Sequence, residues 1–276
     1  MMCSVCGEEH HATSVVAGLT LRRCTRCGLR TSVIPRGGGT SYADVDDAAY
    51  LQSIGRVRQA QAAEIVAFAR AHANGDWLDV GCGYGFVLDA ARAAGFRVRG
   101  IEPDAKAARV ARERIGDVET GFLHDGTPQT DVLSTLDVLE HLDDINAFAQ
   151  LVKRKVRALW VIKVPSADGL LFRIAHALRI RGAIERLWQS RYEHPHRVYF
   201  DERTLHRFLR KHGFEVVATH YLEEMPTSTV VERLTLDAAI PRWKARLAVP
   251  AVALINTIEQ LRSRSDAMLV IARPPR

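Results

Sequence analysis

Three glycines at alternate positions, Gly81, Gly83 and Gly85, follow a short apolar run and precede a segment with helical spacing. Glycine lets the backbone turn sharply and lets a ligand approach it closely, and the helix that follows offers free N–H groups and the positive end of its dipole. Asp79 stands two residues before the first glycine. This arrangement predicts a small-molecule pocket at the carboxyl end of a strand, where open α/β sheets bind their ligands.

An acidic residue further along narrows the choice of ligand. The dinucleotide fingerprint Gly-x-Gly-x-x-Gly would place its third glycine at position 86, which is Phe86. A second predicted strand, residues 97–102, ends in Glu102, whose carboxylate can accept both hydroxyls of a ribose. At this point a flavin or nicotinamide site, or a glycine turn without a ligand, is the alternative.

The run Asp-x-Gly-x-Gly-x-Gly, with the acid after the second strand, resembles the cofactor signature of the class I S-adenosylmethionine-dependent methyltransferases. The resemblance implies S-adenosylmethionine as the cofactor. The residues that it assigns to the cofactor are Asp79, Gly81, Cys82, Gly83, Gly85, Glu102, Pro103, Asp125, Leu136 and Asp137. Of these, Leu136 and Asp137 would lie near the methionine portion, and Asp125 comes from a loop that is shorter than is typical of the family.

Histidines and a tyrosine are the candidate catalytic residues. His141 lies in a Leu-Glu-His-Leu stretch common in one large branch of the family; it suits deprotonation of a hydroxyl, or a local backbone bond at a helix start. His194 and His196 are expected to face the same side of an extended chain as bases or acceptor contacts. A divalent metal would also fit this pair, but no partner carboxylate stands at suitable spacing. Tyr42, in a lead-in resembling that of sugar methyltransferases, would contact the acceptor or pack.

Four of the five cysteines form two Cys-x-x-Cys pairs that are separated by seventeen residues. They are Cys3, Cys6, Cys24 and Cys27. A glycine after each pair allows a tight turn, and four thiolates complete a tetrahedral zinc shell. We predict a structural zinc ribbon over residues 1–36 that needs its metal to fold, with a disulfide pair as the alternative. The fifth cysteine, Cys82, is interpreted as a small residue that fits the glycine loop.

Zinc ribbons joined to methyltransferase domains occur in bacterial sugar and natural-product methyltransferases, which this chain resembles in the order of its parts. The resemblance implies methyl transfer to a hydroxyl or carbon of a small or lipid-linked acceptor. The alternatives are a ribosomal RNA methyltransferase whose ribbon contacts the RNA, and a catalytically silent cofactor-binding scaffold. The ribbon has few basic residues and no aromatic residues interleaved with them, which argues against nucleic acid.

Strands and helices alternate along the rest of the chain. The expected strands are 76–80, 97–102, 118–121, 131–137, 158–164, 214–219 and 268–272, and the expected helices are 59–72, 86–94, 105–114 and 203–212. This alternation predicts a doubly wound α/β sheet. The resemblance implies the Rossmann-like methyltransferase fold, with seven mostly parallel strands. We expect a linker and lead-in at 37–55 and a methyltransferase domain at 56–276, with insertions at 166–200 and 222–265 that cover the acceptor.

Charge is unevenly distributed along the chain. Residues 1–150 carry 15 Lys and Arg against 20 Asp and Glu, whereas residues 151–276 carry 23 against 12. The basic half predicts an anionic acceptor or surface, unless it is a solvated arginine-rich face. Within it, residues 170–191 alternate apolar and arginine positions and are interrupted by Gly182, so they could contact a membrane or pack on the sheet. Without a signal pattern or a spanning apolar run, we expect a cytoplasmic protein, with peripheral contact to the inner membrane face as an option.

Overall fold

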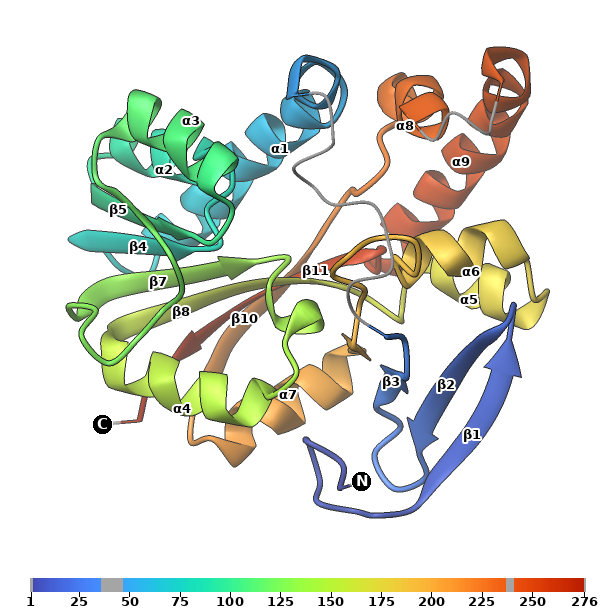
Figure 1. Cartoon of the computed structure of the whole chain (residues 1–276), viewed down its shortest axis with the longest axis horizontal. Coiled ribbons are helices and arrows are strands. Elements are labelled where there is room, and N and C mark those ends of the chain that lie inside the picture. Colours follow the sequence, from blue (N-terminus) through green and yellow to red (C-terminus); the bar gives the residue numbers. More distant parts are fainter. Residues whose placement is uncertain (1, 36–46, 237–240, 276) are drawn as a thin grey trace.

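The structure of the chain is a computed structural model that describes residues 2–35, 47–236 and 241–275. Within these residues, seven strands form one sheet in the order β10-β11-β8-β7-β4-β5-β6 (Figure 1). The strands are β4 (Asp76–Val80), β5 (Arg97–Glu102), β6 (Val118–Thr120), β7 (Thr130–Leu136), β8 (Val156–Pro165), β10 (Glu215–Leu222) and β11 (Ala267–Arg273). In this sheet β11 runs antiparallel to both of its neighbours, and the other pairs are parallel. The predicted doubly wound, mostly parallel sheet is confirmed.

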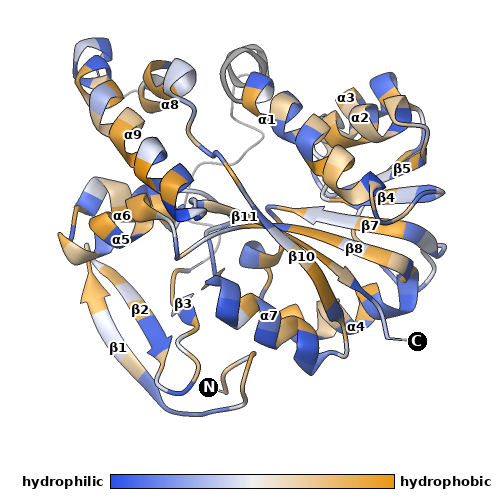
Figure 2. Ribbon diagram, turned by 180° about the vertical axis from the view of Figure 1, so that it is seen from behind, coloured by the Kyte–Doolittle hydropathy of each residue, from blue (hydrophilic) through white to orange (hydrophobic). Residues whose placement is uncertain are grey.

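Helices cover both faces of this sheet (Figure 1). One face carries α1 (Asp47–Arg70), α2 (Phe86–Ala93) and α3 (Ala105–Ile115), and the other carries α4 (Ile145–Lys155) and α7 (Glu202–Lys211). Because successive residues of a strand point to opposite faces, Trp77 packs in the core beneath α1–α3 and Leu78 in the core above α4 and α7. Figure 2 shows α7 with both hydrophilic and hydrophobic turns, as expected of a helix with one buried face.

The N-terminal strands form a second sheet that includes a strand from the far half of the chain. The strands are β1 (His11–Val16), β2 (Leu19–Cys24), β3 (Arg30–Ser32) and β9 (Val198–Tyr199). All pairs are antiparallel, and β3 pairs with β9 so that Thr31 lies opposite Val198. Cys3, Cys24 and Leu29 also belong to the same core cluster as the residues of α4 and α7. The N-terminal segment is therefore packed on the main body.

Both predicted insertions contain helices. They contain α5 (Leu170–Ala177) and α6 (Arg181–Leu187) in the first, and α8 (Val230–Leu236) and α9 (Arg242–Arg262) in the second. The expected break at Gly182 is wrong, because Gly182 lies in the first turn of α6. The chain turns instead at Arg179, whose φ of 53° is incompatible with a continuing right-handed helix. No helix among the described residues is long and apolar enough to cross a bilayer.

Candidate functional site

The predicted glycine loop follows β4, beside the end of β5 (Figure 1). The φ angles of Gly81, Gly83 and Gly85 are 76°, 52° and 81°, a region that glycine adopts without strain. A Cβ at position 81 would lie 2.7 Å from Cγ2 of Val138, whereas a Cβ at position 83 would enter open space. The loop is thus closed against the residues after β7 and open at Gly83, which suits a cradle for a ligand.

Two buried carboxyl groups flank this loop. Glu102 accepts the backbone N–H of Gly83 at 2.7 Å on Oε2 and that of Asp104 at 2.9 Å on Oε1. Asp79 accepts the hydroxyl of Ser134 at 2.5 Å. Burial raises the pKa of both carboxyls, to about 7 for Asp79. The two backbone amides hold the Glu102 carboxylate over the loop.

The loop and the turn after β5 are closely packed. A Cβ at Gly100 would lie 2.8 Å from Sγ of Cys82, so the small side chain at position 82 fits the available space. Burial raises the pKa of the Cys82 thiol, which makes it a poor nucleophile, in keeping with its interpretation as a packing residue. Pro103 follows Glu102 and leads into Asp104, which caps α3.

The predicted residues after β6 and β7 lie in different surroundings. Leu136 is half-buried at the end of β7. Asp137 follows with a φ of 56°, and its carboxylate accepts from Nζ of Lys163 at 2.8 Å on each oxygen. Asp125 is largely exposed and pairs with Arg154 at 2.8 Å, which lowers the pKa of Asp125. Its role towards the cofactor stays a prediction.

An ion network that the sequence did not predict lies at the carboxyl ends of β7 and β8. Lys163, 1% exposed, bonds both Asp137 and Glu224, the latter at 3.0 Å. Arg58 lies 2.9 Å from Asp137 and 3.5 Å from Glu224. Burial acts to raise the pKa of Glu224, but the positive charges of Arg58, Lys163 and Arg233 outweigh it and hold this pKa well below its usual range. In the sequence, a charged residue within an apolar strand, Lys163, was a sign that a partner of opposite charge lies nearby. Glu224 lies in a loop, and its sequence position did not indicate that it is this partner.

The fold brings together two of the three candidate histidines, His141 and His196. The prediction that His194 and His196 face the same side is wrong, because the chain bends at His194, which is exposed, whereas His196 is buried. The His196 ring packs edge-to-face on His141, with 4.8 Å between centroids. Glu140 joins them, so that one potential ligand atom from each residue lies within 4.8 Å of the others. We refer to Glu140, His141 and His196 as the histidine–glutamate cluster. Tyr42 lies outside the described residues.

This cluster follows directly from the end of β7. Glu140 and His141 belong to the short 3-10 helix η2 (Leu139–His141), and His196 precedes β9. Burial lowers the pKa of both histidines, so that their rings are neutral at neutral pH. Burial also raises the pKa of Glu140 well above its usual value. The sequence signal for Glu140 was its place beside His141 in the Leu-Glu-His-Leu stretch.

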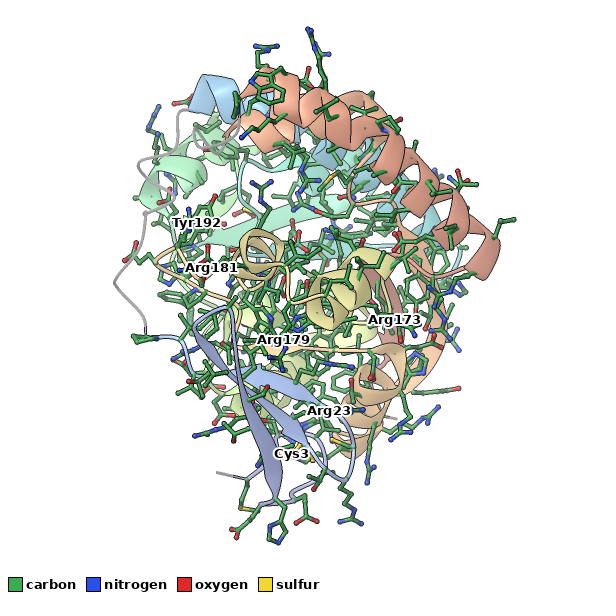
Figure 3. All side chains as sticks on the ribbon, turned by 90° about the vertical axis from the view of Figure 1, so that its right-hand side faces the viewer. Cys3, Arg23, Arg173, Arg179, Arg181 and Tyr192 are labelled. Atoms are coloured by element: carbon green, nitrogen blue, oxygen red, sulfur yellow. The ribbon has the colours of Figure 1, made fainter. Side chains whose placement is uncertain are left out.

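The four predicted zinc ligands meet beside the N-terminal sheet, where Figure 3 labels Cys3. We call them the cysteine cluster. Their sulfur atoms lie within 4.8 Å of one another, and the Cys3–Cys27 and Cys6–Cys24 separations are 3.5 Å. Tetrahedral zinc, with Zn–S bonds of about 2.3 Å, places sulfurs about 3.8 Å apart. The thiols are free, at distances too long for a disulfide. Burial acts to raise the pKa of Cys24, but hydrogen bonds from backbone N–H groups outweigh it and lower this pKa to about 6.

Comparison with protein families decides the assignment of the main body. A family model described as a methyltransferase domain matches residues 54–219, more than half of the chain. The chain belongs to this methyltransferase family. It is an enzyme of that class, and the matched residues include the glycine loop, both flanking acids and the histidine–glutamate cluster.

Solved structures share the fold of this methyltransferase. An S-adenosylmethionine-dependent methyltransferase from Archaeoglobus fulgidus is 18% identical, with a TM-score of 0.53 over 81% of this chain and 97% of its own. Magnesium protoporphyrin IX methyltransferase from Synechocystis PCC 6803, solved with bound SAH, is 15% identical, with a TM-score of 0.53 over 86% and 90%. A chain from the Haloferax volcanii complex of the Trm112 activator with a putative methyltransferase is 15% identical, with a TM-score of 0.59 over 85% and 96%. Identities this low show the fold alone. No curated protein sequence matches this methyltransferase.

Proposed function

We propose that this methyltransferase uses S-adenosylmethionine to methylate a hydroxyl or a carbon of a small or lipid-linked acceptor. The carboxylate of Glu102, held over the glycine loop by the N–H of Gly83, carries the cofactor assignment. A carboxylate there can accept the hydroxyls of a ribose, and the open space at Gly83 leaves room for the ligand. When bound, the cofactor supplies an activated methyl group, so the protein's task is to align the acceptor and exclude water.

The glycine loop provides the test of this proposal. Calorimetric titration with S-adenosylmethionine is expected to detect binding to the wild type and none to Gly83→Val, because valine is strained at a φ of 52° and fills the open space. Gly95→Val is the matched control, since Gly95 has a φ of 95° with open space around it but precedes β5 at the opposite end of the strand. Retained affinity in Gly83→Val, or an equal loss in Gly95→Val, would contradict the assignment.

Charge near the predicted acceptor side supports an anionic acceptor. Residues 151–276, which include both predicted insertions, carry 23 Lys and Arg against 12 Asp and Glu. A phosphate or carboxylate on the acceptor would complement this positive charge. Turnover of matched acceptors with and without a phosphate group measures this preference, and faster turnover of the neutral member would contradict it.

The turn between α5 and α6 supports contact with a lipid surface. Leu178 and Ile180 are 70% and 44% exposed there. Figure 3 shows Arg173, Arg179 and Arg181 on the same side of the molecule. Apolar side chains surrounded by arginines suit the interface of an anionic membrane. We therefore extend the proposal to an acceptor presented at such a membrane.

Vesicle cosedimentation tests the membrane contact. Binding to anionic phosphatidylglycerol vesicles is expected to exceed binding to neutral phosphatidylcholine vesicles, and the double variant Leu178→Ser/Ile180→Ser is expected to lose it. Phe122→Ser is the matched control, because Phe122 is 76% exposed but lies next to β6, at the other edge of the main sheet. Equal sedimentation of all three proteins would contradict the proposal.

The cysteine cluster supports a structural zinc site, which we include in the proposal. Four thiolates fill the tetrahedral shell and leave no position for a substrate. The ribbon surface also fits a small acceptor better than RNA, because Arg30 is turned inward, 3.6 Å from Asp201 and over the ring of Phe172. Salt-sensitive binding of structured RNA in a gel shift would favour the RNA alternative instead.

A further inference from the structure

The histidine–glutamate cluster contains buried polar atoms that lack partners. Both carboxylate oxygens of Glu140 and Nδ1 of His196 have no hydrogen-bond partner among residues 2–35, 47–236 and 241–275. Glu140 is 1% exposed and His196 is 6% exposed. A buried carboxylate without partners is costly, and sites that retain one commonly use it to bind something. One potential ligand atom from each of Glu140, His141 and His196 lies within 4.8 Å of the other two.

Backbone contacts hold the three residues in place. Nδ1 of His141 bonds the carbonyl of His194 at 2.8 Å. A carbonyl can only accept, so Nδ1 of His141 donates its proton in this contact. The carbonyl of Glu140 accepts the N–H of Arg197 at 2.6 Å, which ties the 3-10 helix η2 to the residue after His196. Hydrogen bonds of this kind orient the ligands of metal sites.

We propose that Glu140, His141 and His196 bind a divalent transition-metal ion. Two imidazoles and one carboxylate suit manganese, iron, cobalt or zinc better than magnesium or calcium, which prefer oxygen ligands. Metal–ligand bonds of about 2.0–2.2 Å place ligand atoms about 3–4 Å apart, so small side-chain rotations from the present spacing close the site. Asp137 is not a ligand in this scheme, because Lys163 and Arg58 hold its carboxylate.

The site would be of the catalytic kind. Three protein ligands leave coordination positions open, in contrast to a closed four-thiolate shell. Its place is beside the cofactor loop, since Val138, two residues before Glu140, is the residue against which Gly81 packs. The class of ligand for the open positions is therefore an oxygen donor of the acceptor.

The consequence for the reaction rests on the proposed methyl transfer. A hydroxyl bound to the metal has a lowered pKa and releases its proton to solvent. Its oxygen then attacks the sulfonium methyl group as the carbon–sulfur bond breaks, giving a methyl ether and a neutral thioether. No further oxidant or reductant is needed. Metal binding itself does not depend on this step, so it is tested separately.

The test uses the full chain with one equivalent of zinc per chain, which the four thiolates of the cysteine cluster take up, so that the histidine–glutamate cluster starts without metal. Manganese is the probe, because it has little affinity for thiolates, and free manganese is counted by electron paramagnetic resonance during titration. We expect one ion to bind per chain, and Glu140→Gln and His196→Asn each to weaken binding more than about tenfold. His194→Asn, which changes an exposed side chain of the same segment, is expected to leave the affinity unchanged.

Two outcomes overturn the proposal: no manganese bound by the wild type, or affinity that Glu140→Gln and His196→Asn leave unchanged. If a variant fails to fold, manganese-induced broadening of the His141 and His196 ring signals in the NMR spectrum of the wild type gives the same decision, and sharp signals at saturation overturn it. Because these measurements need neither cofactor nor acceptor, a negative result is distinguishable from failure of the proposed methyl transfer.

Discussion

The cysteine cluster and the histidine–glutamate cluster both gather ligand atoms within 4.8 Å, yet they are built in opposite ways. The first takes two short Cys-x-x-Cys pairs from one end of the chain and offers four soft ligands in a closed shell. The second joins Glu140 and His141 to His196, more than fifty positions further on, and offers mixed ligands in an open shell. The difference teaches that one site is suited to hold the fold together and the other to act on a ligand.

The largest expected effect is loss of the zinc shell. Cys24→Ser is expected to lose zinc and to lower the free energy of unfolding by about 3–5 kcal/mol, because in our proposal the metal holds the ribbon core together. Zinc content by plasma mass spectrometry and urea unfolding measure the change. Cys82→Ser is the control, since Cys82 lies outside the cluster. If Cys24→Ser keeps one zinc per chain and the wild-type stability, the cysteine cluster is not the structural site that this comparison assumes.

The second prediction concerns Asp79, a buried acid that accepts a hydrogen bond from Ser134. The pKa of Asp79 is about 7 in the fold and about 4 in an unfolded chain, so the folded state binds more protons between these values. Asp79 should therefore contribute a fall in stability of about 2–3 kcal/mol as the pH rises from 5 to 8. Urea unfolding of Asp79→Asn should show a fall smaller by this amount, whereas the exposed control Asp117→Asn should retain the wild-type slope. If Asp79→Asn leaves the pH dependence of the unfolding free energy unchanged, Asp79 is not its source.

The third prediction is that replacing two acidic residues near the glycine loop, Glu140 and Glu102, changes the free energy of unfolding in opposite directions. Without added metal, Glu140→Met is expected to raise the free energy of unfolding by about 1–2 kcal/mol, because it removes a buried carboxyl that lacks partners among the described residues. Glu102→Met should lower it, because it leaves the amides of Gly83 and Asp104 without their acceptor. Thermal unfolding measures both variants. Destabilisation by Glu140→Met would mean that its carboxyl is part of the fold's stabilising contacts.

The smallest effect concerns the link between the two clusters. Ser32, on β3, donates through Oγ to the carbonyl of His196 at 2.6 Å. Ser32→Ala is expected to weaken manganese binding about fivefold, equivalent to about 1 kcal/mol, while the zinc content stays at one per chain. Ser14→Ala, on the exposed face of β1, should change neither quantity. Equal manganese affinities of the wild type, Ser32→Ala and Ser14→Ala would mean that the contact from β3 does not affect the histidine–glutamate cluster.

Local patterns made much of the site predictable from sequence. The glycine loop and Glu102 lie within one strand–helix–strand unit, so their spacing alone brings them together. The two cysteine pairs each form a turn of a few residues, and their meeting needs only a short hairpin. In such cases the contacts that matter are close in sequence, and residue type and spacing carry the information.

The parts of the site that the sequence did not predict depend on contacts between distant segments of the chain. His196 reaches Glu140 because the chain bends at His194 and β9 then pairs with β3, and neither event leaves a local pattern. Glu224 meets Lys163 through a loop after β10, for which no signal existed. The predicted start of the first helix was also wrong, because α1 begins at Asp47, well before the expected residue 59.

The pairing of β3 with β9 has a practical consequence for anyone dissecting this protein. Expression from residue 56 onward would leave the backbone groups of Val198 and Tyr199 unsatisfied and expose the apolar surface that Val5 and Leu29 now cover. Such a fragment should self-associate, and its inactivity would say nothing about where the chemistry resides. Point substitutions in the intact chain are the better instrument for separating the two halves.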